Sequence, residues 1–390
     1  MAADELQQLT RNSVDVLPRG ELERKLARGR PLRVKLGIDP TAPDIHLGHT
    51  VPLGKLAAFQ QFGHTAVLII GDYTARIGDP SGRSKERPVL SGEELDRNAR
   101  TFAEQAFTIL DPALTEVRYN SEWLGRLDFA EILRITRTAT VARLLERDDF
   151  ARRMAAAEPI SVSELLYPLM QGYDSVAIEA DVELGGTEQL YNLLAGREVM
   201  EAYGLEPQVA MTLPILVGTD GKERMSKSKG NYVGVAEPPE EQFGKVMSIP
   251  DSALEDWWRL CLGGDPPALE PMESKLELSR RIVGRYHGPE AVLTAEAHFT
   301  RVVRRHEAPE EVPQVGVRRD GEAAYLPGLL KDWFGLSSTS EARRMISQGG
   351  VRVDGEVVTD LDVPWDRLAG ALVQAGKRRF ARVFLESDAS

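Results

Sequence analysis

The stretch V-K-L-G-I-D-P-T-A-P-D-I-H-L-G-H, residues 34–49, decides the fold of this chain. A short apolar run of strand type, Arg33 to Ile38, stops at Asp39 and Pro40. A turn-rich segment follows, and a helical period begins near Ile45. The stretch therefore predicts a strand, a tight turn and the start of a helix.

Two histidines mark the predicted helix start. His46 and His49 are three residues apart and share one face of the first turn, and Gly48 leaves the backbone open to a bulky ligand. Free N–H groups, the helix dipole and two imidazole donors would then converge on one point, which suits a phosphate. For an isolated His-x-x-His, plain packing is the more common role.

A second signature, Arg224-Met225-Ser226-Lys227-Ser228, changes that ranking. It follows the apolar strand candidate Met211 to Val217, roughly 180 residues downstream. By itself it would be an ordinary basic surface loop. Together, in this order, H-L-G-H and R-M-S-K-S resemble the HIGH and KMSKS signatures of class I aminoacyl-tRNA synthetases.

Composition narrows the classes of protein. The 390 residues, 42% hydrophobic and 28% charged, suit two or three domains of a soluble globular protein. The first 30 residues lack the apolar run of a secretory signal, and we expect no membrane span. Cys261 is the one cysteine, which excludes an intrachain disulfide and fits the cytoplasm. Because the net charge is -12, an RNA partner would need a local basic surface.

The body of the chain alternates strands and helices from Val34 to Gly218, which predicts a mostly parallel α/β sheet. The apolar run Ala66 to Gly71 is typical of a central strand, and a glycine-rich basic loop, Gly78 to Arg87, follows it. Leu6 to Arg30 is expected to be helical with a break at Pro18. The expected domains are a catalytic domain at 1–235 with a helical insertion at about 90–160, a helical domain at 236–305, a linker at 306–322 and an RNA-binding domain at 323–390.

Two further motifs carry polar residues. Tyr167, Gln171 and Asp174 fall at i, i+4 and i+7, hence on one helical face, where a structural polar network is the alternative role. The turn G-G-T-E-Q, residues 185–189, opens the next helix and lets the backbone approach a ligand.

The last segment has its own signals. Ser338-x-x-Glu341 is a capping-box pattern before a helix with Arg343 and Arg344, and Asp354-Gly355 predicts a hairpin. Lys377, Arg378 and Arg379 stand beside an aromatic residue. From residue 323 onward basic and acidic side chains are equal in number, so the negative charge lies before this segment, which is the better candidate for contact with a polyanion.

Taken together, both signatures, G-D-P-S-G-R, Y-P-L-M-Q-G-Y-D, G-G-T-E-Q and the tail resemble the bacterial tyrosyl-tRNA synthetases over nearly the whole chain. The resemblance implies a Rossmann-like doubly wound parallel sheet with a helical insertion, a small α-helical domain and a C-terminal α+β domain of the αL type shared with a ribosomal small-subunit protein. It implies a cytoplasmic homodimer without membrane association, whose substrates are L-tyrosine, ATP and tRNA(Tyr). Mg²⁺ would arrive with ATP, with no metal held by the protein. Tyrosine's carboxylate would attack the α-phosphate, and the adenylate would then esterify tRNA.

The resemblance also gives residue roles. The expected catalytic residues are His46, His49, Arg83, Arg87, Arg224 and Lys227, which would supply positive charge to a charge-spread transition state. The expected ATP-binding residues are Asp39, Thr41, His46, Gly48, His49, Gly186, Glu188 and Lys227. The expected tyrosine-binding residues are Gly37, Thr74, Asp79, Tyr167, Gln171, Asp174 and Gln189, with Asp174 on the phenolic hydroxyl. The expected tRNA-binding residues are Arg343, Arg344, Lys377, Arg378 and Arg379.

Three departures from the family pattern leave questions open. Lys35-Leu36-Gly37 stands where the best-known form has Tyr-Cys-Gly, so the partner of Asp174 at the hydroxyl is undetermined. Glu188 replaces a common Asp, and Arg224 replaces a common Lys, which is not a neutral change at a phosphate. The alternatives are a tryptophanyl or other adenylyl-transferring relative, and a splicing or scaffold protein built on a synthetase-like body.

Overall fold

The structure, a computed structural model, describes residues 2–40, 44–81, 92–304, 312–376 and 379–385. It divides into two compact units. The first contains residues 1–238 and 245–286, and the second contains residues 239–244 and 287–390. Each unit is described by itself.

The first unit is built on a six-stranded sheet in the order β1-β6-β5-β2-β3-β4. The five strands β2 to β6 are parallel, and β1 is antiparallel at one edge. The strands are β1 Asp15–Leu17, β2 Arg33–Ile38, β3 Thr65–Ile70, β4 Thr115–Tyr119, β5 Val182–Gly186 and β6 Val209–Leu213. The chain moves outward from β2 first through β3 and β4, then through β5 and β6. The order therefore reverses between β2 and β5, which is the point where doubly wound sheets bind ligands.

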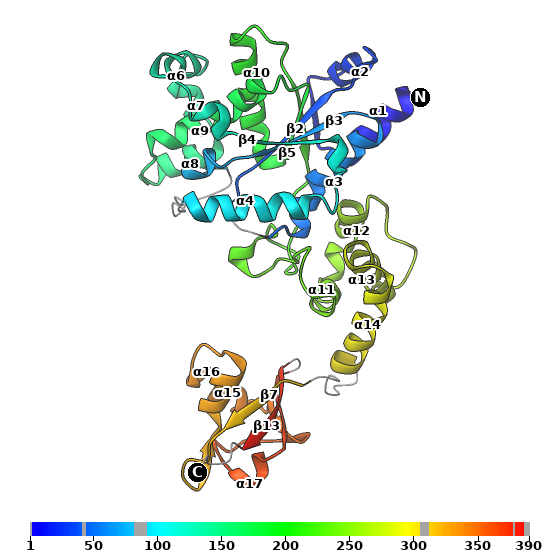
Figure 1. The fold of residues 1–390 in the computed structure, drawn as a ribbon, viewed down its shortest axis with the longest axis vertical. Coiled ribbons are helices and arrows are strands. Elements are labelled where there is room, and N and C mark those ends of the chain that lie inside the picture. The colour runs from blue at the N-terminus through cyan, green and yellow to red at the C-terminus, as the bar shows by residue number, and fades with distance from the viewer. Residues whose placement is uncertain (1, 41–43, 82–91, 305–311, 377–378, 386–390) are drawn as a thin grey trace. The chain divides into compact units, whose positions relative to one another are not determined.

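Helices cover both faces of this sheet. In Figure 1, α3 and α4 lie on one side of the strands and α10 on the other. The bounds are α3 Leu47–Gln61, α4 Gly92–Ala106, α9 Val162–Ala177 and α10 Leu190–Ala202. Five of the six residues of β3, T-A-V-L-I-I, are buried, as expected for a central parallel strand. The predicted α/β class, the strand Arg33–Ile38 and a helix start close to Ile45 are confirmed, while residues 41–43 of the predicted turn lie outside the described residues.

The N-terminal segment differs from the expected broken helix. It forms α1 (Ala2–Thr10), the edge strand β1 and α2 (Glu21–Leu26). Val16 of β1 pairs with Met211 of β6, and Pro18 directly follows the strand. A three-residue strand that ends at a proline is too short to leave a recognisable period-2 pattern, which explains the error.

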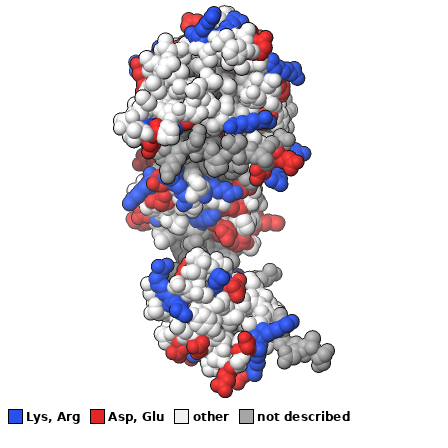
Figure 2. Space-filling view, turned by 90° about the vertical axis from the view of Figure 1, so that its left-hand side faces the viewer, with Lys and Arg blue, Asp and Glu red and all other residues white. Residues whose placement is uncertain are grey.

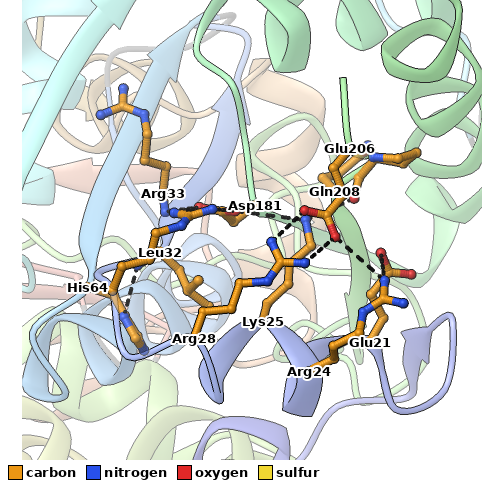
Figure 3. A network of polar contacts seen from close by, with 12 residues as sticks. Glu21, Arg24, Lys25, Arg28, Leu32, Arg33, His64, Asp181, Glu206 and Gln208 are labelled. Atoms are coloured by element: carbon orange, nitrogen blue, oxygen red, sulfur yellow. Dashed lines mark hydrogen bonds and ion pairs between the residues drawn. The ribbon is translucent and has the colours of Figure 1, made fainter. Parts of the chain in front are cut away.

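The amino ends of the parallel strands meet in a polar network centred on Asp181 (Figure 3). The Arg30 guanidinium donates to both Asp181 oxygens, at 2.6 and 2.8 Å, and the backbone N–H of Arg33 donates at 3.0 Å. The buried ammonium of Lys25 lies 3.8 Å from the same carboxylate and donates to the carbonyl of Pro207. Arg28 and Glu206 form a further two-bond ion pair in the network. These bonds fasten α2 and the starts of β2, β5 and β6 together.

The expected helical insertion begins later than predicted. Residues 92–119 supply α4 and then β4, which pairs in parallel with β3 and is a strand of the main sheet. The helices that follow β4 without an intervening strand are α5 Ser121–Leu124, α6 Phe129–Thr136, α7 Val141–Leu145, α8 Asp148–Ala155 and α9. A single short strand between two helical stretches was not enough to show that residues 92–119 belong to the sheet.

The predicted helices after residue 236 are present as α11 Pro239–Met247, α12 Leu254–Leu262, α13 Pro271–His287 and α14 Pro289–Phe299. Trp257 and Trp258 of α12 and Leu278 of α13 share one apolar cluster with Leu47 at the start of α3. Within the first unit, α12 and α13 therefore pack directly behind the H-L-G-H segment.

The second unit holds a five-stranded sheet in the order β10-β9-β12-β13-β7 and a two-stranded sheet of β8 and β11. Besides α14 and the first residues of α11, its elements are β7 Gln314–Val317, β8 Ala323–Tyr325, α15 Leu326–Phe334, α16 Thr339–Ser347, β9 Val351–Val353, β10 Glu356–Val357, β11 Asp362–Pro364, α17 Trp365–Leu368, β12 Leu372–Ala375 and β13 Arg379–Leu385. Asp354 and Gly355 form the predicted hairpin turn, with φ of 48° and 84°. β7 pairs with β13, so the expected linker at 306–322 contains a strand of this sheet. In the described part of the chain, no helix is long and apolar enough to cross a membrane.

Candidate active site

A cavity of about 530 Å³ opens at the carboxyl ends of the parallel strands, at the point where the strand order reverses. Its size is that of a small-molecule site. The structure brings every described residue of the expected catalytic, ATP and tyrosine sets to its wall. These are Gly37, Asp39, His46, Gly48, His49, Thr74, Asp79, Tyr167, Gln171, Asp174, Gly186, Glu188, Gln189, Arg224 and Lys227. Thr41, Arg83 and Arg87 lie outside the described residues.

The first signature is held in place by the segment that follows the second. The backbone N–H of Leu47 donates to the carbonyl of Val233 at 2.9 Å, and the N–H of Val235 donates to the carbonyl of Ile45 at 2.8 Å. Helix α4 adds a bond from the other side, because the Gln105 side-chain oxygen accepts the Ile45 N–H at 2.7 Å. Backbone hydrogen bonds thus join the first signature to the segment that follows the second, although the two are far apart in sequence.

The two histidine rings stack at 3.8 Å between centroids, and Nδ1 of His49 accepts the backbone N–H of His46 at 3.2 Å. This bond puts the ring proton of neutral His49 on Nε2, which is left as a donor. Burial lowers the pKa of His46 to about 4 and lowers the pKa of His49 well below its usual value. At neutral pH both rings are therefore uncharged, and they can offer N–H donors but not the positive charge expected from the sequence.

The second signature forms a short loop that is anchored by a buried amide. The Asn231 side chain accepts the backbone N–H of Ser226 at 2.8 Å and donates to the carbonyl of Arg224 at 3.2 Å. Residues Lys227–Lys229 make one 3-10 turn. The Lys227 ammonium donates to Asp44 at 2.5 Å, and this bond raises the pKa of Lys227. The loop thus presents a permanently charged lysine at the cavity rim, next to the first signature.

The polar wall between the two signatures contains Asp39. Its carboxylate accepts from the Tyr167 hydroxyl at 2.9 Å and from the Thr74 hydroxyl at 2.8 Å. Gly71 makes this approach possible, because a Cβ there would lie 2.1 Å from an Asp39 oxygen. The three expected site residues therefore form one hydrogen-bonded group.

Glu188 has a different environment on the same wall. Its Oε2 is buried without a hydrogen-bond partner among the described residues, and burial raises its pKa. A Cβ on Gly186 would lie 2.3 Å from that carboxylate, so the glycine is required for this approach. A buried oxygen with an open lone pair, next to a backbone free of side chain, is suited to accept hydrogen bonds from a ligand.

Asp174 lies at the inner end of the cavity and is held by two residues that sequence reasoning missed. Nε1 of Trp123 donates to Oδ1 at 2.7 Å, and the Asn120 amide donates to Oδ2 at 3.3 Å. Burial raises the pKa of Asp174 to about 7, while nearby Lys35 and these two donors oppose the rise. Asn120 immediately follows β4, and that position at the carboxyl end of a parallel strand was the available signal.

The structure shows what Lys35 bonds to. Its ammonium is fully buried and donates to Glu183 at 2.8 Å, to the Ser175 hydroxyl at 2.8 Å and to the carbonyl of Gln171 at 2.7 Å. Lys35 thus lies beneath α9, where it supports the helix that bears Gln171 and Asp174. The residue that stands in the family tyrosine's place is a structural cation in this chain.

The expected RNA contacts belong to the second unit. Arg343 lies over the Tyr325 ring and donates to its hydroxyl at 2.7 Å. The pKa of Glu341 is lowered, mainly by hydrogen bonds from Ser337. The positive charges of nearby Arg379 and Arg344 lower it further. Figure 2 shows basic and acidic side chains interspersed on the face in view. Lys377 and Arg378 lie outside the described residues.

Comparison with known proteins gives consistent results. The family described as tRNA synthetases class I (W and Y) matches residues 27–298, and the S4 domain matches residues 327–364. The tyrosine–tRNA ligase of Moorella thermoacetica is 50% identical over 397 residues, covering 98% of this chain and 96% of that protein. The tyrosine–tRNA ligase of Thermotoga maritima is 49% identical over 387 residues, covering 96% of each. In fold, the chain is similar to the crystal structure of the Archaeoglobus fulgidus tyrosyl-tRNA synthetase complexed with L-tyrosine, with a TM-score of 0.62 at 23% identity, over 75% of this chain and 99% of that one.

Proposed function

This chain belongs to the tyrosine–tRNA ligases, class I aminoacyl-tRNA synthetases, and we propose how its residues divide the work of that reaction. The enzyme activates L-tyrosine with ATP and transfers the tyrosyl group to tRNA. The observation that supports our proposal is the convergence of both signatures and the tyrosine set on one cavity. The tryptophanyl and scaffold alternatives are not needed, because the full-length relatives named above are tyrosine–tRNA ligases.

The ATP end of the cavity lies between the two signatures. The N-terminus of α3, with His46 and His49 as neutral donors, would bind phosphate oxygens, as helix N-termini do. Lys227 and Arg224 would add charge to the α-phosphate as pyrophosphate leaves. Gly186 and Glu188 are suited to the ribose hydroxyls. Mg²⁺ would enter with ATP and be bound mainly by its phosphates, as is usual for this ion.

The tyrosine end lies along α9. Asp79, Tyr167 and Gln171 would bind the ammonium group, and Asp174 would accept the phenolic O–H. Because Trp123 and Asn120 hold both Asp174 oxygens in place, the substrate hydroxyl meets an acceptor that is already oriented. Phenylalanine would leave this buried carboxyl without that partner, and such a loss is expensive.

No side chain needs to act as a nucleophile in this scheme. The tyrosine carboxylate oxygen bonds to the α-phosphorus and the bond to pyrophosphate breaks. In the second step a ribose hydroxyl of the terminal tRNA adenosine bonds to the tyrosyl carbonyl, and AMP leaves. The protein contributes positioning and donors aimed at the developing charge.

The C-terminal part of the chain is the proposed tRNA-binding module, through Arg343 and Arg344 within the S4 match and Arg379 after it. We also propose that the enzyme is a homodimer. Large apolar side chains are exposed on the helices after β4, and a second copy is their proposed cover, since obligate interfaces are apolar. They are Phe129, Leu133, Val141, Met154 and Val162. The cytoplasm is the proposed location.

Truncation after residue 306 tests the division of labour between the two parts of the chain. Tyrosine-dependent pyrophosphate exchange should persist, because the cavity lies wholly before residue 239, while aminoacylation of tRNA should fall and lose its steep salt dependence. Equal loss of both activities would mean that the tail supports folding.

Exchange assayed with twenty amino acids tests the tyrosine assignment. Sedimentation of a Phe129→Glu/Val162→Glu double variant tests the dimer, which should dissociate.

A further inference from the structure

A buried arginine outside the cavity is bonded to its wall. Arg147, between α7 and α8, is 5% exposed and does not line the cavity. Its guanidinium pairs with Asp149 at 2.9 and 3.1 Å. It also donates to Oδ1 of Asn192 at 2.9 Å and to the Ser81 hydroxyl at 3.1 Å.

Asn192 connects Arg147 to two glutamines that do line the cavity. Its side chain is fully buried, and its Nδ2 donates to Oε1 of Gln171 at 3.1 Å and to Oε1 of Gln189 at 3.0 Å. The Nε2 of Gln171 in turn donates to Glu183 at 3.0 Å, and the Nε2 of Gln189 donates to Asp79 at 2.7 Å.

Arg147 determines the orientation of all three side-chain amides in this series of hydrogen bonds. A guanidinium has donors only, so the oxygen of Asn192 must face Arg147 and its NH₂ must face the glutamines. The glutamines must then turn their oxygens toward Asn192 and their NH₂ groups toward the two carboxylates. If the Asn192 amide were reversed, its oxygen would face the side-chain oxygens of both glutamines, and no hydrogen bond could form there.

We propose that Arg147 and Asn192 are positioning residues for tyrosine: they hold the oxygen of Gln171 toward the substrate ammonium and keep Asp79 bonded to Gln189. This inference rests on the proposed roles of Gln171 and Asp79. With its oxygen facing Asn192, Gln171 has a second lone pair to offer to an ammonium group. With the amide reversed, it would present N–H groups to a cation, and tyrosine would bind less well.

Asn192→Asp is the sharpest test, because it keeps the shape and the bond from Arg147 but cannot donate to the glutamines. The KM for tyrosine in pyrophosphate exchange should rise by about 10- to 100-fold, the cost typical of a reversed or unpaired buried polar group, with the KM for ATP and kcat changed far less. Arg147→Met should act in the same direction, and Arg147→Lys should recover part of the loss. Melting temperatures measured on the same samples report folding.

Arg153 provides the matched control. It is a buried arginine on α8, 6% exposed, and it pairs with Glu164 and the carbonyl of Pro159. Arg153→Met should lower the melting temperature and leave the KM for tyrosine within about twofold of wild type. A tyrosine KM that stays at the wild-type value in folded Asn192→Asp, or an Arg153→Met variant that raises it equally, would overturn the inference. If the wild type failed to activate tyrosine, the proposed function itself would be wrong.

Discussion

The two ends of one parallel sheet use buried polar residues in different ways. At the amino end, both oxygens of Asp181 are bonded to Arg30, and Lys25 lies beside them. At the carboxyl end, Glu188 keeps an oxygen without a partner in the described structure, and a cavity separates the side chains. A carboxylate such as Asp181, whose two oxygens are both paired, serves mainly the stability of the protein, whereas one such as Glu188 that keeps an unpaired oxygen can accept a hydrogen bond from a ligand. Substitutions at the amino end should therefore lower the stability of the protein, and substitutions at the carboxyl end should impair substrate binding or catalysis.

The largest effect is expected at Asp174. Asp174→Ala removes the acceptor for the substrate hydroxyl, so the preference for tyrosine over phenylalanine should collapse. Sites that hydrogen-bond a substrate hydroxyl reject the analogue without it by about 10⁴ to 10⁵, and the value established for tyrosyl-tRNA synthetases is about 10⁵. The ratio of kcat/KM for the two amino acids measures it, with Asp174→Asn as an intermediate. A variant that still rejects phenylalanine would make Asp174 structural, like Asp181.

Asp181 should behave in the opposite way. Asp181→Ala leaves buried Lys25 without its nearby carboxylate and removes the partner of Arg30, so the free energy of unfolding should fall by about 3–5 kcal/mol. Chemical denaturation measures this change. Below the unfolding transition, the KM for tyrosine should match that of wild type. A folded variant with impaired tyrosine binding would show that the two ends are coupled.

Lys227→Ala should act on rate. A charge aimed at developing phosphate charge contributes mainly in the transition state, so tyrosine activation should slow by about a hundredfold, or about 3 kcal/mol, while tyrosine affinity changes little. Pre-steady-state kinetics separates the two. Lys229→Ala, on the same 3-10 turn and paired with Glu223, is the control and should react at the wild-type rate. Weakened tyrosine binding with an unchanged rate would place Lys227 outside the reacting centre.

The smallest expected effect is on the pH dependence of stability, which should have opposite signs for Asp174 at the carboxyl end and His64 at the amino end. Burial raises the pKa of Asp174 to about 7, so the native state keeps a proton that the unfolded state releases, and its contribution is lost as pH rises from about 4 through 7. Burial lowers the pKa of His64, whose Nδ1 accepts the backbone N–H of Leu32 at 3.2 Å, so its contribution is lost as pH falls below about 6.5.

Each group should give a slope of at most about 1.4 kcal/mol per pH unit. Melting curves from pH 5 to 8 for wild type, Asp174→Asn and His64→Gln test the signs. Relative to wild type, Asp174→Asn, which mimics the protonated carboxyl, should gain stability at high pH, and His64→Gln, which mimics the neutral ring, should gain it at low pH. Equal slopes in all three proteins would mean that neither group titrates as described.

Features that rest on local sequence patterns could be predicted, and features that rest on contacts between distant segments could not. The central strands were predictable because burial on both faces leaves continuous apolar runs, as in β3. Tyr167, Gln171 and Asp174 were found because helical spacing puts them on one face. The strand β1 has three residues and leaves no pattern. Trp123 was missed because its role depends on where β4 ends in space, and the partner of Lys35, Glu183, is 148 residues away in the chain. Burial that neutralises His46 and His49 is likewise a property of the folded state.

The backbone bonds between Leu47 and Val233 also bear on how the enzyme is made. During translation the first signature leaves the ribosome long before the segment that pairs with it. At about 5–20 residues per second, the intervening residues take about 10–40 s to synthesise. In the folded chain, strand β2 pairs with β3, which is synthesised early in that interval, and with β5, which is synthesised late. The H-L-G-H helix start bonds to residues 233 and 235, which come at its end. The nucleotide site can therefore be complete only after residue 235 has been synthesised, and we expect a chain stalled before that residue to consume no ATP.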